Sequence, residues 1–276
     1  MAIALVTGGS SGIGLATVRR LAAGGDQVFY GSRTAAPGGV FRAFGAQVTH
    51  VPLDLADPSS CDAAVPAVTA AAGRLDVLVN CAGSGGLAPL EEASDAEAHR
   101  IFEVNVFGPM RLIRAAVPVM QAGGGGRIVN VTSMNDIAPA PFGGWYSASK
   151  SALMSLSYVL GAELADTGIA VTVVAPGLFR TPMSESLPAQ RAAPGSRFTG
   201  AFETLARSSA ERLAEAGNPD DAARVIEDCV RSEFPPARVV AGADGIAMEQ
   251  AVRAASADDL ARMLGQAVGR LTAGTG

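Results

Sequence analysis

Charged and aromatic side chains are scarce in this chain. Of its 276 residues, 17% are charged and 5% are aromatic, whereas 49% are apolar. The net charge is −5 and no basic stripe offsets it, which argues against a general nucleic-acid-binding surface. No apolar run approaches the ~18 residues that a membrane-spanning helix requires. We therefore expect neither a nucleic-acid partner nor membrane insertion, and we attribute the apolar content to a buried interior.

Cysteine is equally scarce. Cys61, Cys81 and Cys229 are odd in number and form no ligand-like cluster, so we expect reduced thiols and no metal site. The first predicted strand begins at Ala2, which leaves no room for a signal peptide. These features predict a cytoplasmic protein.

Short apolar runs alternate with helical patterns over the first two-thirds of the chain. The runs are continuous in Val, Ile and Leu, which is typical of strands covered on both faces. The predicted strands comprise residues 2–7, 27–31, 47–51, 75–80, 127–132, 169–175 and 238–241. The predicted helices comprise residues 13–23, 58–72, 95–121, 145–166, 201–216 and 219–232, followed by a helical tail over 248–271 with a break near Ser256.

Strand–helix repetition of this kind predicts parallel strands joined by right-handed crossovers. We therefore predict an α/β fold with a doubly wound, mostly parallel, Rossmann-type sheet and helices on both faces. The predicted organisation is a single domain over residues 1–242, followed by a C-terminal helical extension over residues 243–276.

A glycine-rich turn follows the first predicted strand and precedes the first predicted helix. Such a turn lets backbone N–H groups approach a pyrophosphate, and the helix N-terminus adds a favourable dipole. A tight turn that binds nothing is the alternative, but the position between a strand and a helix favours a dinucleotide site. The candidate phosphate-binding residues are Gly8, Ser10, Ser11, Gly12, Ile13 and Gly14.

Tyr146 and Lys150 lie four residues apart in a predicted helix, so their side chains project from one face. A lysine ammonium beside a phenol stabilises the phenolate and lowers the pKa of the tyrosine, as general acid–base catalysis requires. A surface pair is the ordinary alternative. Ser133 favours catalysis, because it follows a buried strand at the sheet edge where doubly wound folds bind ligands. Its hydroxyl can bond a substrate oxygen as charge develops there.

Further motifs follow the glycine turn in order along the chain. Thr7-Gly8-x-x-x-Gly12-Ile13-Gly14 closely resembles the cofactor turn of the short-chain dehydrogenase/reductase family. The resemblance continues through Asp54, Asn80-Cys81-Ala82-Gly83, Asn105, Ser133, Tyr146-x-x-x-Lys150 and Pro176-Gly177-x-x-x-Thr181. It covers roughly residues 2–182. The overall layout is most similar to the branch related to 17β-hydroxysteroid and retinol dehydrogenases.

The resemblance implies that the domain over residues 1–242 binds a dinucleotide and carries catalysis, with substrate-loop helices at about 181–232. The implied catalytic residues are Asn105, Ser133, Tyr146 and Lys150. Asn105 would hold a water that links the lysine to solvent, or serve only a structural role. The implied cofactor contacts are Asp54 and Leu55 at the adenine, Asn80, Ala82 and Gly83 alongside the cofactor, Tyr146 and Lys150 at the nicotinamide ribose, Pro176 and Gly177 after the sixth strand, and Thr181 at the carboxamide. For Asp54, a simple loop aspartate is the alternative.

The end of the second predicted strand bears on the choice of cofactor. A dinucleotide without a 2′-phosphate is usually marked there by an acid that accepts from the ribose hydroxyls. This chain has Tyr30-Gly31-Ser32-Arg33-Thr34 instead, with no Asp or Glu. Arg33 offers a guanidinium suited to a phosphate, although a solvated surface arginine is the ordinary alternative. We therefore predict that NADP(H) is favoured over NAD(H).

Asp136 departs from the family's pattern, which often has a glycine three residues after the serine. Its carboxylate could recognise a polar substrate group, but we favour a role in shaping the loop. An apolar small-molecule substrate is indicated by the composition of the substrate segments. The residues that suggest it are Phe142, Phe179, Met183, Phe198 and Phe202.

We interpret the chain as an NADP(H)-dependent oxidoreductase that interconverts a carbonyl and a secondary alcohol by hydride transfer, with Tyr146 as proton donor and acceptor. Two alternatives stay open: a catalytically silent dinucleotide-binding scaffold or regulator, and an epimerase or dehydratase on the same fold. The resemblance also implies a homodimer or homotetramer that pairs through the helices at 95–121 and 145–166.

Overall fold

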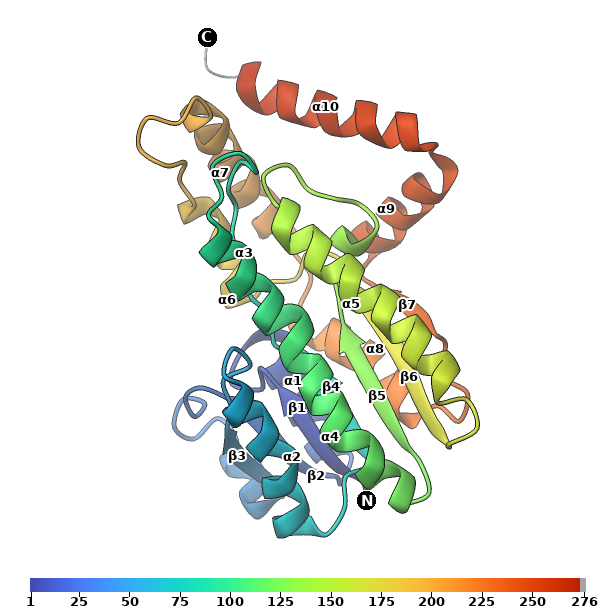
Figure 1. The fold of residues 1–276 in the computed structure, drawn as a ribbon. Coiled ribbons are helices and arrows are strands. Elements are labelled where there is room, and N and C mark those ends of the chain that lie inside the picture. The colour runs from blue at the N-terminus through green and yellow to red at the C-terminus, as the bar shows by residue number, and fades with distance from the viewer. Residues whose placement is uncertain (274–276) are drawn as a thin grey trace.

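Seven strands form one sheet in which every neighbouring pair is parallel (Figure 1). The computed structural model describes residues 1–273. The strands are β1 (Ile3–Thr7), β2 (Gln27–Ser32), β3 (Val48–Pro52), β4 (Val77–Asn80), β5 (Gly126–Val131), β6 (Ile169–Pro176) and β7 (Arg238–Ala241). Their order is β3-β2-β1-β4-β5-β6-β7. The order reverses between β1 and β4, and the carboxyl ends of these two strands therefore border the crevice where such sheets bind ligands.

Helices cover both faces of the sheet, as predicted (Figure 1). They are α1 (Gly12–Ala23), α2 (Pro58–Ala72), α3 (Asp95–Phe102), α4 (Gly108–Ala122), α5 (Gly144–Glu163), α6 (Pro182–Glu185), α7 (Thr199–Ala214), α8 (Pro219–Arg231), α9 (Ala243–Ala254) and α10 (Ala257–Ala273). None of the helices within residues 1–273 is both long and apolar enough to span a bilayer.

The strands are apolar on both sides because each face packs against helices. Leu5 and Val6 are neighbours on β1 and point to opposite faces. Leu5 belongs to the core that includes Leu112 of α4, whereas Val6 belongs to the core that includes Leu21 of α1 and Ile226 of α8. The predicted Rossmann-type α/β fold is confirmed.

One predicted helix is interrupted. The helical pattern over residues 95–121 is divided by a π-helical segment, η2 (Glu103–Phe107), which separates α3 from α4. Such segments are often found at functional sites. Asn105 lies in it and is fully buried.

The C-terminal extension begins at α9, earlier than the predicted helical tail, and breaks before α10. Helix α9 packs against β7 and against a short 3-10 turn, η3 (Met134–Asp136), while α10 packs against α7. The extension thereby runs from the β7 edge of the sheet to the helix that follows the loop after α6 (Figure 1). It contacts both the sheet and the segment predicted to select the substrate.

Candidate active site

The glycine turn between β1 and α1 is built for close approach of the backbone. Gly8 and Gly12 have φ values of +69° and +52°, which favour glycine. A Cβ atom on Gly8 would lie 2.9 Å from the Cα atom of Ala82, and one on Gly14 would collide with the carbonyl oxygen of Gly8. Side chains at these positions would therefore fill the turn.

The first turn of α1 keeps its N-terminus open. Ser11 is the N-cap residue, and its side chain caps none of the N–H groups among the described residues. An uncapped N-terminus on a helix of 12 residues favours an anion. With the glycine cradle in front of it, the turn fits the pyrophosphate of a dinucleotide.

The loop after β4 is tied to the glycine turn. The Thr7 hydroxyl accepts hydrogen bonds from the backbone N–H groups of Cys81 and Ala82, both at 3.0 Å. The next residue, Gly83, faces the catalytic candidates, since a Cβ atom there would lie 3.5 Å from Nζ of Lys150. The loop thus connects the predicted cofactor residues with the predicted catalytic residues.

Thr181 closes the turn from the other side. A Cβ atom on Gly12 would lie 3.1 Å from Cγ2 of Thr181, so the segment after β6 faces the start of α1. Thr181 is the N-cap of the short helix α6 and exchanges hydrogen bonds with Ser184. The structure therefore brings the predicted residues at the ends of β1, β4 and β6 to one place.

Ser133, Tyr146 and Lys150 meet beside this loop. Lys150 is buried, donates from Nζ to the Val131 carbonyl at 3.0 Å, and lies 5.8 Å from the centroid of the Tyr146 ring. The phenol of Tyr146 is half-buried, and the nearby Ser133 hydroxyl acts to lower its pKa. Ser133 also accepts from the Asn135 N–H at 3.2 Å, and this contact orients it at the start of η3.

Burial controls the ionisation of these groups. It raises the pKa of Tyr146 above its ordinary value, while the Ser133 hydroxyl opposes this shift and the Asp136 carboxylate adds to it. The direction is opposite to the lowering expected from Lys150. Burial also lowers the pKa of Lys150 to about 8, against smaller raising effects of Cys81 and Asp136. Lys150 in this structure carries its full charge only below that pH.

Asn105 joins three elements around the site. Its Oδ1 atom accepts from the Ser84 N–H at 2.7 Å, and its Nδ2 atom donates to the Ser84 carbonyl at 2.8 Å and to the Ser149 hydroxyl at 2.9 Å. These contacts hold the loop after β4 against η2 and α5. They establish a structural role, and the water-holding role stays a prediction.

Two other predicted cofactor residues, Asn80 and Gly177, make contacts within the protein itself. Asn80 donates from Nδ2 to Oδ1 of Asn130 at 2.8 Å, and this bond links β4 to β5. The position of Gly177 leaves no room for a side chain, because a Cβ atom there would collide with the carboxylate of Asp244. That carboxylate accepts a hydrogen bond from the Leu178 N–H at 2.7 Å. Pro176 ends β6 just before this contact.

The residues after β2 and β3 form the far end of the candidate cofactor site. Arg33 is exposed and has no hydrogen-bond or ion-pair partner within residues 1–273. The adjacent Ser32 hydroxyl donates to the Thr34 carbonyl at 2.7 Å and lies 3.2 Å from Nε2 of His50. His50 was not singled out from the sequence. Only its pairing with Tyr30 across β2 and β3 brings it here.

At the same end of the sheet, Asp54 turns its carboxylate towards its own loop. The Oδ1 atom accepts from the Ala56 N–H at 3.0 Å, and Leu55 is buried in the core. The predicted adenine contact through Asp54 stays a prediction.

The substrate segments carry an aromatic cluster. Phe142 lies 5.4 Å from Phe198 and 5.0 Å from Phe202 between ring centroids. Met183 lies near Tyr146, because a Cβ atom on the intervening Gly85 would be 3.3 Å from the Tyr146 ring and 3.9 Å from Sδ of Met183. Phe179, predicted with this group, is instead buried in the core with the helices α1 and α8.

The family model described as short chain dehydrogenase matches residues 2–192. The chain belongs to this family. It is an oxidoreductase of the short-chain dehydrogenase type, and its similarity to such enzymes extends beyond the glycine turn.

Two relatives illustrate the range of the family. A 3-alpha-(or 20-beta)-hydroxysteroid dehydrogenase of Mycobacterium tuberculosis is 36% identical over 187 residues, which cover 67% of this chain and 72% of that protein. The short-chain reductase protein NovJ of Streptomyces niveus is 34% identical over 235 residues, which cover 84% of this chain and 87% of that protein. The predicted resemblance, including hydroxysteroid dehydrogenases, is confirmed.

Solved structures agree over nearly the whole chain. A short-chain dehydrogenase from Streptomyces avermitilis is 33% identical with a TM-score of 0.80, and the match covers 92% of this chain and 93% of that one. A 3-ketoacyl-(acyl-carrier-protein) reductase from Brucella melitensis, in complex with NADH, is 27% identical with a TM-score of 0.72 over 87% and 96% of the two chains. L-sorbose reductase from Gluconobacter frateurii, in complex with NADPH and L-sorbose, is 29% identical with a TM-score of 0.75 over 88% and 95%.

Proposed function

We propose that this protein is an NADP(H)-dependent oxidoreductase that interconverts a ketone and a secondary alcohol on an apolar small molecule. The observation that carries the proposal is the convergence of Ser133, Tyr146 and Lys150 beside a glycine cradle at the point where the strand order reverses. Family members solved with NADH and with NADPH support a nicotinamide dinucleotide as the cofactor.

The side chains divide the work of carbonyl reduction. NADPH held by the glycine turn and Arg33 would supply a hydride to the carbonyl carbon and leave as NADP⁺. Tyr146 gives its phenolic proton to the carbonyl oxygen, and the Ser133 hydroxyl, which lies near that phenol, holds the same oxygen. Lys150 stabilises the phenolate that remains. In alcohol oxidation each transfer runs in reverse.

The preference for NADP(H) rests on Arg33. Its exposed guanidinium has no partner among residues 1–273, and the adjacent Ser32 is engaged with Thr34 and His50. A guanidinium at this position binds a 2′-phosphate by charge-assisted hydrogen bonds. No acid at the end of β2 competes for the ribose.

The substrate is proposed to be apolar because of the groups around Tyr146. Met183 and the Tyr146 ring both border Gly85, and Phe142, just before α5, forms the aromatic cluster with Phe198 and Phe202 at the start of α7. A wall of this composition favours a ketone with hydrocarbon substituents.

A carbonyl panel with NADPH and NADH in parallel tests the proposal. Steroids, quinones, aromatic ketones, polyketide-like ketones and retinal would be assayed by cofactor oxidation and product analysis. Tyr146→Phe should abolish turnover while nucleotide affinity changes little. Binding of NADPH without oxidation by any carbonyl would favour the silent scaffold. A rearranged or dehydrated product would favour the epimerase or dehydratase.

We also propose that the protein forms a homodimer or homotetramer in the cytoplasm. Helix α5 exposes Leu156, Tyr158 and Val159 at 38%, 44% and 56% of their accessible surface. Light scattering measures the mass, and a Val159→Glu variant that becomes monomeric would place the contact on this helix.

A further inference from the structure

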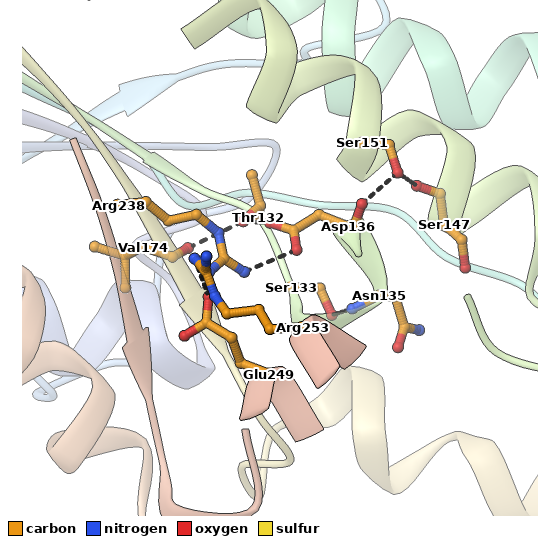
Figure 2. Close-up of polar contacts among 10 residues, drawn as sticks. All are labelled: Thr132, Ser133, Asn135, Asp136, Ser147, Ser151, Val174, Arg238, Glu249 and Arg253. Carbon is orange, nitrogen blue, oxygen red and sulfur yellow. Dashed lines mark hydrogen bonds and ion pairs between the residues drawn. The ribbon is translucent and has the colours of Figure 1, made fainter. Parts of the chain in front are cut away.

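A buried charge pair links the C-terminal part of the chain to the turn that follows Ser133. The side chain of Asp136 in η3 is fully buried. Its Oδ2 atom accepts from the Thr132 hydroxyl at 2.7 Å, and its Oδ1 atom pairs with Arg238 of β7 at 3.0 Å (Figure 2). The turn is thus held by a residue 102 positions further along the chain.

Arg238 bridges two carboxylates. One terminal nitrogen pairs with Asp136 and the other with Glu249 of α9, and the side chain is only 8% exposed (Figure 2). Glu249 also pairs with Arg253 at 3.2 Å, on the surface of the same helix. The planar guanidinium, with its fork of N–H donors, fits this double contact.

The same turn orients the catalytic groups. The backbone carbonyl of Asp136 accepts from the Ser151 hydroxyl at 2.6 Å, so η3 is fastened to α5 one residue beyond Lys150. The Asn135 N–H donates to Ser133 within the turn. Displacing Asp136 would therefore disturb both the serine and the helix that carries Tyr146.

The charge of Asp136 also reaches the catalytic pair. Burial raises the pKa of this carboxyl, and the Thr132 hydroxyl, Arg238 and Lys150 oppose the shift. In turn, the carboxylate raises the pKa of Tyr146 and of Lys150. The other titratable groups that the structure places here, within residues 1–273, are Cys81, which acts on Lys150, Glu249, which pairs with Arg238, and Arg253, which pairs with Glu249.

From this geometry, and resting on the function proposed above, we infer that Asp136 and Arg238 are positioning residues through which β7 and α9 set the charge beside Tyr146 and Lys150. Asp136 supplies a negative charge next to the reacting groups. Arg238 cancels part of that charge, and the Thr132 hydroxyl holds the carboxylate independently of it. The two residues therefore act on the same groups with opposite signs.

Because the two residues carry opposite charges, their substitution should shift the pKa of Lys150 in opposite directions, which a purely structural role would not do. Asp136→Asn removes the negative charge and keeps the shape, so the ammonium of Lys150 loses an attraction and its pKa falls. Arg238→Met leaves the carboxylate without its partner, so the pKa of Lys150 rises. If the two residues only held the turn in place, both variants would shift the pKa of Lys150 in the same direction or leave it unchanged.

Lys150 is the only lysine in the chain, so selective isotope labelling of lysine yields a single side-chain NMR signal. We would titrate this signal in the purified protein, starting from a pKa of about 8. Asp136→Asn should lower the value by about 0.5–1 pH unit, and Arg238→Met should raise it by a similar amount. Arg238→Lys, which keeps the charge, should stay near the wild-type value. Arg262→Met, an exposed arginine of α10, serves as the matched control.

Thermal unfolding verifies that each variant is folded, and Asp136→Asn alone decides the matter if Arg238→Met does not fold. Unchanged titration of Lys150 in Asp136→Asn, or a shift in the same direction in both variants, would overturn the inference. In active enzyme, the acid limb of kcat for alcohol oxidation should move to lower pH in Asp136→Asn, with KM nearly constant. Wild-type protein that turns over no carbonyl would defeat the proposed function. The titration would still test whether Asp136 and Arg238 set the pKa of Lys150.

Discussion

The two ends of the candidate active site differ in how deeply their charged groups are buried. The cofactor end, at the tips of β1, β2 and β4, consists of glycine backbone and exposed groups, with Arg33 as its cation. The reacting end, after β5, on α5 and at the start of β7, consists of buried charges, with Lys150 and Arg238 as its cations. An exposed cation costs the fold little and is free to meet a ligand. A buried one must be paired or pay in stability.

This difference implies different consequences of substitution. Changes at the cofactor end should alter nucleotide affinity and leave stability and pH dependence nearly unchanged. Changes at the reacting end should alter turnover, stability and pH dependence together. The following predictions probe that division, beginning with the largest expected effect.

Lys150→Met should lower turnover by a factor of about 10²–10⁴, because the phenolate of Tyr146 loses its cation. The same variant should be more stable than wild type. In the folded protein the pKa of Lys150 is about 8, below the ordinary 10.5. The unfolded chain therefore binds the extra proton between these values, and wild-type stability rises with pH across that window.

At pH 7 the buried charge of Lys150 costs roughly 3 kcal/mol, so Lys150→Met should gain stability there and lose its advantage near pH 10. Denaturant unfolding at several pH values measures this. A variant that is less stable than wild type at pH 7 would mean that the bond from Lys150 to the Val131 carbonyl outweighs the cost of burial.

Arg238→Met should lower the free energy of unfolding by about 3–5 kcal/mol, since Asp136 and Glu249 are left without their shared partner. The control is Arg262→Met in α10, whose side chain is 64% exposed and whose pair with Asp259 should be worth less than about 0.5 kcal/mol. Equal losses in the two variants would remove the distinction between buried and exposed cations on which the comparison rests.

Candidates at the two ends of the site come from patterns of different range along the sequence. The glycine turn and Arg33 are local patterns, readable within a few residues of β1 and β2. The apolar runs that become strands are local too, so the fold was predicted. Ser133, Tyr146 and Lys150 could be aligned because each follows a recognisable element.

Long-range contacts were beyond such patterns. Asp136 stood out in the sequence, but its partner Arg238 lies 102 residues away on another strand. The π-helical segment η2 interrupts a continuous helical pattern, and it holds Asn105 between Ser84 and Ser149, which no local periodicity reveals. His50 reaches Ser32 only through the pairing of β2 with β3.

Arg33→Ala should weaken NADPH binding by about 10–100-fold, the value of one charge-assisted contact, and should leave NADH binding nearly unchanged. Fluorescence titration of each cofactor measures both constants. Arg74→Ala is a matched control, because Arg74 is also exposed but lies before β4, at the amino ends of the strands and away from the candidate site. Equal weakening of NADPH and NADH in Arg33→Ala would contradict the assignment of this residue to the phosphate.

Arg253→Gln should have the smallest effect. It tests whether an exposed cation that contacts the same carboxylate as a buried one contributes in the same way. Arg253 contacts the same oxygen of Glu249 that Arg238 contacts, yet its side chain is 73% exposed. If burial rather than contact decides what a cation contributes, the free energy of unfolding should change by less than about 0.5 kcal/mol and the titration of Lys150 should stay where it is. A shift in the pKa of Lys150 comparable to that in Arg238→Met would instead mean that the charge of the exposed Arg253 also acts on Lys150. Salt would then screen this effect, because Arg253 lies at the surface.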